Sequence, residues 1–275
     1  MLPFSPGPVP TTDTELTSRL TDGLTQLLRP REVSTITVTA AGATAEHLDA
    51  VSLDLSGAEI DPVAGEVPTA GGTPVSVDRV TVLADPLTVG GVRAQVRGEL
   101  RRVPAAWVTD GAGMLWLVPQ QDGRSAGAAG AAEGEVEVAA QIADLEAGVL
   151  AIGRPMLAER GFTLTGVQLQ VEATGASRAE VRVRAQVRRG ILSATVDGRG
   201  TASVDEALVL TLTDLNVSSA NPLVSMGLAM VGRHLQAWEG RRIDLGGYLV
   251  GGLRVRQVAV YSADGRVAVS AQVGQ

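Results

Sequence analysis

Side chains that act as acids, bases or nucleophiles near neutral pH are scarce in this sequence. The 275 residues include no cysteine and only two histidines, His47 and His234, which lie far apart along the chain. Without cysteine, disulfide bonds, thiolate metal sites and cysteine nucleophiles are excluded. Neither histidine has a second histidine or a carboxylate at the spacing of a common metal-binding motif. We therefore expect both to be solvated or satisfied within the fold, and we predict no metal site.

Sequence motifs of known catalytic sites are also missing. The chain contains no G-x-x-x-x-G-K-[ST] and no H-E-x-x-H, and its one G-x-S-x-G match, Gly123–Gly127, falls in the alanine- and glycine-rich segment instead of between a predicted strand and a predicted helix. The glycine-rich segments GAGMLW (111–116) and GGYLVGG (246–252) lack the phosphate-loop pattern and predict turns. Asp205 and Glu206 are adjacent at a predicted strand start, where solvated turn charges are more typical than an acid/base pair. We expect a non-catalytic protein without a cofactor.

Charge, composition and apolar segments limit which binding partners and which cellular compartment we expect. The formal net charge of −7 and the aromatic content of 3% argue against nucleic acid, which requires a cationic field and stacking rings. The first residues, MLPFSPGPVP, have neither a basic leader nor a long apolar run, and no segment reaches the roughly 20 apolar residues of a membrane span. We expect a cytoplasmic protein, with the cell envelope as the alternative if the natural start lies upstream.

The first half of the chain predicts one helix followed by strands. A helix within 11–30 is indicated by the capping-box spacing of Thr12 and Glu15, by leucines at helical spacing and by the stop at Pro30. Alternating segments then predict an antiparallel sheet. The alanine- and glycine-rich segment 120–135 predicts a flexible connection near the middle of the chain. It divides one domain, 1–275, into halves at about 12–119 and 136–275.

The second half repeats this order of elements. A helix over 143–161 should be kinked or restarted at Pro155 and capped by Gly161. Strict alternation over 179–187 predicts a strand with one polar face, and two further strand-like segments follow. A third helix, beginning at Ser219 or Asn221, is apolar nearly all round in its first half and should be buried on most sides.

Four segments share a slipped alternation. In Val75–Val82, Phe162–Leu169, Leu210–Val217 and Leu253–Val260, two alternating apolar residues are followed by two more in the opposite phase. A β-bulge at the slip would return the apolar side chains to one face and bend the strand, whereas the alternative is a corner of an ordinary sandwich. Each segment should contain a bulge, a sharp bend or an interruption near its slip, at Asp78 and Arg79, Thr165 and Gly166, Thr213 and Asp214, and Arg256 and Gln257. Repeated bulges favour a strongly curved sheet wrapped around a long apolar helix.

The C-terminal run from 208 to 274 resembles the end of the actinobacterial LmeA-type family, a group of TULIP-like (tubular lipid-binding) proteins. The likeness rests on a strand, a short turn, a helix and a glycine-rich loop, followed by GLRV at Gly252–Val255 and by the pattern DGxVxV at Asp264–Val269. The segment 161–190 is similar as well. The resemblance implies a curved sheet around long helices, with an apolar groove for acyl chains, in a lipid carrier or an envelope-lipid accessory protein.

Taken together, we expect an α+β fold in which a long, strongly curved antiparallel sheet wraps around long helices in two helix-plus-strands halves. The expected partner is a lipid or another hydrophobic small molecule, with possible peripheral membrane contact. The alternatives are a structural or protein-interaction domain without a ligand and an enzyme. The helix residues should face the concave side of the strands, so the predicted groove consists of Leu223, Met226, Met230, Leu235, Leu210, Leu212, Leu253, Val255, Val258 and Val260.

Overall fold

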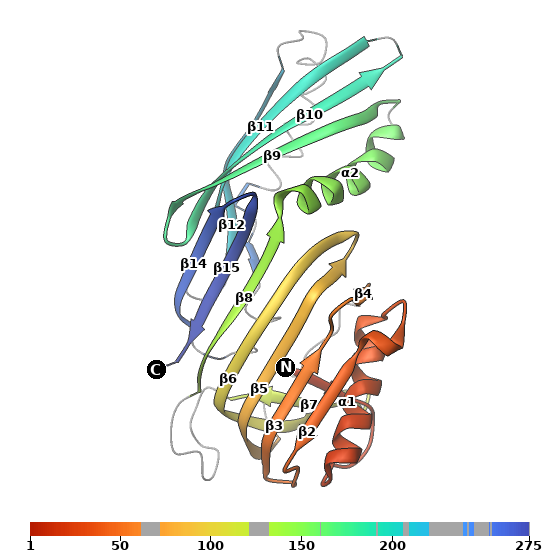
Figure 1. The fold of residues 1–275 in the computed structure, drawn as a ribbon, viewed down its shortest axis with the longest axis vertical. Coiled ribbons are helices and arrows are strands. Elements are labelled where there is room, and N and C mark those ends of the chain that lie inside the picture. The colour runs from red at the N-terminus through yellow and green to blue at the C-terminus, as the bar shows by residue number, and fades with distance from the viewer. Residues whose placement is uncertain are drawn as a thin grey trace.

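The computed structural model describes residues 1–61, 72–120, 132–159, 161–190, 192–205, 209–219, 239–240, 242–244, 253 and 255–274. Within them the protein consists mostly of long, curved strands in two open sheets (Figure 1). The helical elements are α1 (Asp13–Leu28), the 3-10 turn η1 (Val33–Thr35) and α2 (Ile142–Ala158). The β-rich, curved character expected from the sequence is confirmed. The third predicted helix lies outside the described residues.

The first sheet is mixed, which corrects the expectation of a purely antiparallel sheet. Its strands follow the order β14-β15-β8-β6-β5-β3-β2, with β1 and β4 joined at the side through β7 and β5. Both β3 and β4 run parallel to β5, and a tight hairpin cannot join strands that run in the same direction. The strands are β1 (Leu2–Phe4), β2 (Thr37–Ala41), β3 (His47–Asp54), β4 (Glu59–Ile60), β5 (Thr73–Val89), β6 (Val92–Thr109), β7 (Leu115–Pro119), β8 (Glu133–Gln141), β14 (Val255–Ala263) and β15 (Arg266–Val273).

The second sheet is antiparallel and follows the order β13-β12-β11-β10-β9. Its strands are β9 (Thr163–Gly175), β10 (Arg178–Arg189), β11 (Leu192–Val204), β12 (Val209–Ser219) and β13 (Arg242–Asp244). The alternation predicted over 179–187 is confirmed, because those residues lie within β10 with the valines half-buried and the arginines exposed.

Strand β8 joins the two halves of the chain. We expected a flexible connection as far as residue 135, but Glu133–Gln141 forms a strand that pairs with β6 on one side and β15 on the other (Figure 1). Buried Ala132 and Val136 anchor its beginning in the core. Residues 121–131 of the predicted connection lie outside the described residues. The first sheet therefore contains strands from both sequence halves.

Helix α1 forms as its local signals predict. The Thr12 hydroxyl accepts a hydrogen bond from the Glu15 backbone N–H at 3.3 Å, and Arg29 ends the helix in a left-handed conformation just before Pro30. Of the kink or restart predicted at Pro155, the restart does not occur, because α2 continues through this residue. Gly161 has the left-handed φ of 74° expected after a helix. None of the described helices has both the length and the apolar character needed to cross a bilayer.

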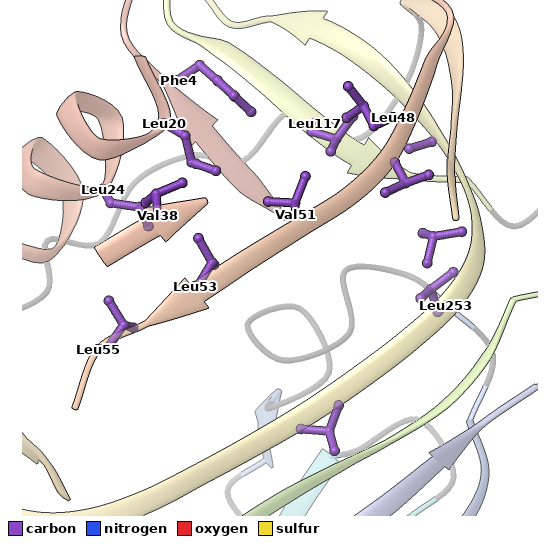
Figure 2. Close-up of a cluster of buried hydrophobic side chains, with 14 of the residues drawn as sticks. Phe4, Leu20, Leu24, Val38, Leu48, Val51, Leu53, Leu55, Leu117 and Leu253 are labelled. Carbon is purple, nitrogen blue, oxygen red and sulfur yellow. The ribbon is translucent and has the colours of Figure 1, made fainter. Parts of the chain in front are cut away.

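The hydrophobic core lies mainly between α1 and the strands of the first sheet (Figure 2). Leu16 and Leu20 of α1 are fully buried, and so is Leu48 of β3. Phe4 packs edge to face against Trp107, with 5.0 Å between the ring centroids. This core fixes the positions of β3 and β5, whose opposite faces carry charged side chains.

Three of the four predicted bulges are confirmed. The pairing of β9 with β10 shifts by one residue at Thr165, because Gly166 lies opposite Gln186 while Leu164 lies opposite Val187. The pairing of β12 with β11 shifts near Asp214, which has a left-handed φ of 56°. The pairing of β14 with β15 shifts between Val255 and Gln257. Each shift lies where the alternation of the sequence slips.

At Asp78 and Arg79 the sheet has an interruption instead of a bulge, because the pairing of β5 with β3 and with β6 skips Asp78. The register of β5 against β6 is the same at Val77 and at Arg79, and the shift in this strand lies between Ala84 and Leu87. Instead, the alternation of buried and exposed residues shifts phase at the same level in three neighbouring strands. The changes occur at Asp49 and Ala50 in β3, Asp78 and Arg79 in β5, and Arg101 and Arg102 in β6. Because the neighbours change at the same level, no extra residue is needed.

At this level a charged row crosses the sheet, which we define as Asp49, Asp78, Arg79, Arg101, Arg102 and Glu133. Cross-strand pairing aligns Ala50 with Arg79, Arg79 with Arg101, and Arg101 with Glu133. Arg102 has a left-handed φ of 52°, which marks the local twist of β6. The row lines a hollow of about 370 Å³ on the sheet surface.

Candidate functional site

The structure places the residues of the predicted groove in different surroundings. Leu223, Met226, Met230 and Leu235 lie outside the described residues. Leu253, Val255 and Val258 belong to the main core, and Val260 is buried as well. Figure 2 shows Leu253 close to the β5 and β6 side of that core. Leu210 packs against the same core, whereas Leu212 lies on the second sheet and is half-buried.

One face of the second sheet is apolar over all four of its long strands. Opposite pairs such as Leu169 with Val183 and Ala185 with Val196 place apolar side chains side by side. We call this the apolar sheet face. It comprises Leu164, Val167, Leu169, Val171, Ala179, Val181, Val183, Ala185, Val187, Ala194, Val196, Ala202, Val204, Leu210, Leu212, Leu215 and Val217.

Two of the confirmed bulges keep this face continuous. The extra residue Thr165 allows both Leu164 and Val167 to lie on it. In β12, the left-handed Asp214 brings Leu215 over Gly200, where a Cβ atom would lie 2.6 Å from the Leu215 Cδ2 atom. The slipped sequence pattern is therefore the local cause of an uninterrupted apolar surface.

Most of the apolar sheet face remains partly exposed. Only Leu164, Val167, Ala179 and Val204 of this face are fully buried, whereas its central valines and leucines are half-buried. On a sheet face that packs in a core, such apolar side chains are normally buried completely. The face therefore offers apolar contact area to a further group.

The opposite face of the same strands is charged. Arg184 pairs with Asp197 of β11 at 2.8 Å, and Arg182 pairs with Glu180 at 3.0 Å. Glutamine, asparagine and serine side chains complete a polar hollow of about 600 Å³ on this face. The second sheet thus has one apolar and one charged face, and an apolar ligand would contact the apolar sheet face.

Helix α2 covers the edge of the second sheet. The Glu146 carboxylate accepts a hydrogen bond from the Leu169 backbone N–H at 2.7 Å, and the Arg154 Nε donates to the Leu164 carbonyl at 3.4 Å. These bonds satisfy backbone groups of the outer strand β9. On its outer side the helix exposes an apolar stripe of Val149, Ile152 and Met156, with exposed fractions of 42%, 58% and 62%.

Comparison with known proteins gives no relative. No protein-family model, curated protein or solved structure matches this chain.

The glycine-rich segment 111–116 forms the predicted turn over 111–114, between β6 and β7, and its last two residues begin β7. The Asp110 carboxylate accepts hydrogen bonds from the Ala112 and Met114 backbone N–H groups at 2.9 Å and from the Trp116 indole at 2.8 Å. Burial raises the pKa of Asp110, but these bonds, with a further one from Gly113, outweigh it and hold the pKa below its usual value. The segment 246–252 lies outside the described residues.

Sequence reasoning missed a cluster around His47. The His47 Nε2 atom lies 3.0 Å from the Asp49 Oδ1 atom and 3.6 Å from the Asp78 Oδ2 atom. Asp49 is two residues from His47 on a strand, so the two side chains share one face, and this spacing was a signal in the sequence. Asp78 joins them through the parallel pairing of β3 with β5, which no local pattern reveals.

Proposed function

We propose that this protein binds a lipid acyl chain or another hydrophobic ligand on the apolar sheet face, without catalysing a reaction. The observation that carries the proposal is the continuity of this partly exposed face across four strands, kept intact by the bulges at Thr165 and Asp214. Each methylene group that leaves water for such a surface contributes about 0.8 kcal/mol, so one acyl chain has enough contact area for measurable affinity.

The likeness to TULIP-like proteins supports the same proposal from the sequence. It assigns lipid carriage to the C-terminal strands and helix, and the described part of that run contributes β12 to the apolar sheet face. The charged opposite face of the sheet stays hydrated, and the ligand binds to the apolar sheet face.

Native mass spectrometry of freshly purified protein tests whether a ligand is carried, because a bound lipid adds its mass to the chain. A titration with a fluorescent fatty acid then locates the site. Val183→Glu places a charge on the apolar sheet face and should weaken binding at least tenfold. Gln186→Glu, on the charged face of the same strand, adds the same charge and should leave binding unchanged.

Thermal melting must show that both variants remain folded at the titration temperature. Equal affinities of the two variants would overturn the assignment of the ligand to this face. The absence of any saturable binding by the unmodified protein, together with no added mass, would overturn the proposed function.

The exposed stripe on α2 favours a second candidate, a protein-interaction domain. Val149, Ile152 and Met156 form a compact apolar strip that a partner chain would cover. A photo-crosslinking residue at position 152 distinguishes the two functions. It should couple to a protein if α2 binds a partner, and to no protein if the molecule acts only as a lipid binder.

A further inference from the structure

The cluster around His47 lies on the solvent side of a rigid part of the first sheet. His47 is opposite Ser76 in the parallel pairing of β3 with β5. Two residues further along each strand, the Asp49 and Asp78 carboxylates both lie near the His47 ring. Side chains two residues apart point to the same face of a strand. The residues between them, Leu48 and Val77, are buried in the core on the other face. Four polar side chains are therefore held together by two strands anchored in the core.

The distances in this cluster fit a metal ion. One ligand atom each from His47, Asp49 and Asp78 lies within 4.8 Å of the others. The imidazole Nε2 is 3.0 Å and 3.6 Å from the two carboxylate oxygens. In a tetrahedral zinc site with ligand distances of about 2.0–2.2 Å, neighbouring ligand atoms lie roughly 3.3–3.6 Å apart. Small side-chain rotations would bring all three atoms into the first coordination shell.

Ser76 orients the imidazole for this role. The His47 Nδ1 atom lies 2.7 Å from the Ser76 Oγ atom. When Nδ1–H donates to this hydroxyl, the lone pair of Nε2 points toward the two carboxylates. Histidines that bind metal ions usually donate their other ring N–H to a polar group in the same way. A lone pair facing two carboxylates is favourable when a cation lies between them.

The charges around the cluster leave both carboxylates available. In the part of the chain that the structure describes, no arginine lies within ion-pair distance of Asp49 or Asp78, and the His47 ring is the nitrogen group that contacts both. The arginines of the charged row pair elsewhere: Arg79 and Arg101 with Glu99, and Arg102 with Glu133.

The fold also leaves room for the Asp49 carboxylate beside Gly42. A Cβ atom at position 42 would lie 2.2 Å from the Asp49 carboxyl carbon, and the φ of Gly42 is 66°. The backbone conformation therefore favours glycine, and a larger residue at position 42 would displace the Asp49 carboxylate.

We propose that His47 Nε2 and the Asp49 and Asp78 carboxylates bind a divalent transition-metal ion of the zinc class, with Ser76 as a positioning residue. One nitrogen and two oxygen ligands suit zinc, whereas calcium takes six to eight oxygen ligands and magnesium prefers an octahedral oxygen shell. Water completes the coordination on the exposed side. The proposal concerns the first sheet and is independent of ligand binding on the second sheet.

Calorimetric titration of the metal-free, full-length protein with Zn²⁺ tests the site, and Co²⁺ reports its coordination geometry through visible absorption. We expect one ion per chain. Asp49→Asn and Asp78→Asn should each weaken Zn²⁺ binding at least tenfold, because each removes a charged ligand without changing its shape. Asp22→Asn, which removes an exposed carboxylate of α1 outside the cluster, should leave the affinity unchanged.

Ser76→Ala should weaken binding roughly tenfold and change the Co²⁺ spectrum, and Ser76→Thr, which keeps the hydroxyl, should restore both. Circular dichroism checks that each variant is folded, which is expected because Asp49 and Asp78 are exposed. No saturable Zn²⁺ binding would overturn the proposal. Binding that is lost in His47→Ala but unchanged in both asparagine variants would also overturn it.

Discussion

Deletion of Thr165 tests the central structural argument, that one extra residue keeps the apolar sheet face continuous. Without Thr165, Leu164 and Val167 would stand two positions apart and would still share a face. The deletion should therefore remove the bulge and leave the apolar surface intact.

The expected cost follows from the contacts of the deleted residue. The Thr165 hydroxyl donates to the Gln186 carbonyl at 3.1 Å, a bond worth about 1 kcal/mol. A shift of β9 relative to α2 weakens the Arg154 bond to the Leu164 carbonyl by a similar or smaller amount. The total loss should be about 1–2 kcal/mol. If Leu164, which is 4% exposed, turned to the charged face, the loss would grow by about 1.5–3 kcal/mol.

Urea denaturation of the unmodified protein, the deletion variant and Thr165→Val measures these free energies of unfolding. Thr165→Val removes only the hydroxyl bond, so it should cost nearly as much as the deletion. Fatty-acid affinity should be unchanged in both. A deletion that costs about 2 kcal/mol or more beyond Thr165→Val would refute the view that Thr165 is an inserted residue.

Three further predictions concern the core and the turn that support these surfaces. Leu20→Ala should lower the free energy of unfolding by about 2–5 kcal/mol in urea denaturation, because Leu20 is fully buried. Gly23→Ala should destabilise by about 1–3 kcal/mol despite alanine's higher helix propensity, since its Cβ would lie 2.4 Å from the Pro3 carbonyl oxygen; equal or greater stability would contradict this. Because the pKa of Asp110 is lowered in the folded state, its contribution is complete above about pH 4 and disappears as the pH falls through the folded pKa. Asp110→Asn should therefore flatten the loss of stability below about pH 4, measured by acid titration of the melting temperature, and an unchanged slope would contradict the assignment.

Local sequence signals predicted the elements that depend on neighbours along the chain. Helix α1 follows from the cap at Thr12 and the stop at Pro30. The bulges at Thr165 and Asp214 follow from the parity of a few apolar residues. In each case the signal lies within one helix or one strand, so it can be recognised in a single sequence.

Features that depend on which strands pair could not be predicted in this way. The slip at Asp78 looks like the other three in the sequence, but β3, β5 and β6 change their buried positions together and need no inserted residue. The contact of His47 with Asp78 likewise requires the parallel pairing of β3 with β5. Pairing of this kind is set by the whole sheet and leaves no local periodicity.

The position of α2 along β9 has a consequence for self-association of the protein. Growth of a fibril by strand addition requires two open edges on each sheet, one to accept a strand and one to offer the next. On the second sheet, Glu146 and Arg154 already occupy backbone groups at the β9 edge, so another chain cannot add there without displacing the helix. If two molecules paired through the other edge of this sheet, the helix would block further strand addition on both sides, and the assembly would stop at a dimer. The helix therefore limits the polymerisation of a sheet whose apolar side chains would otherwise favour stacking.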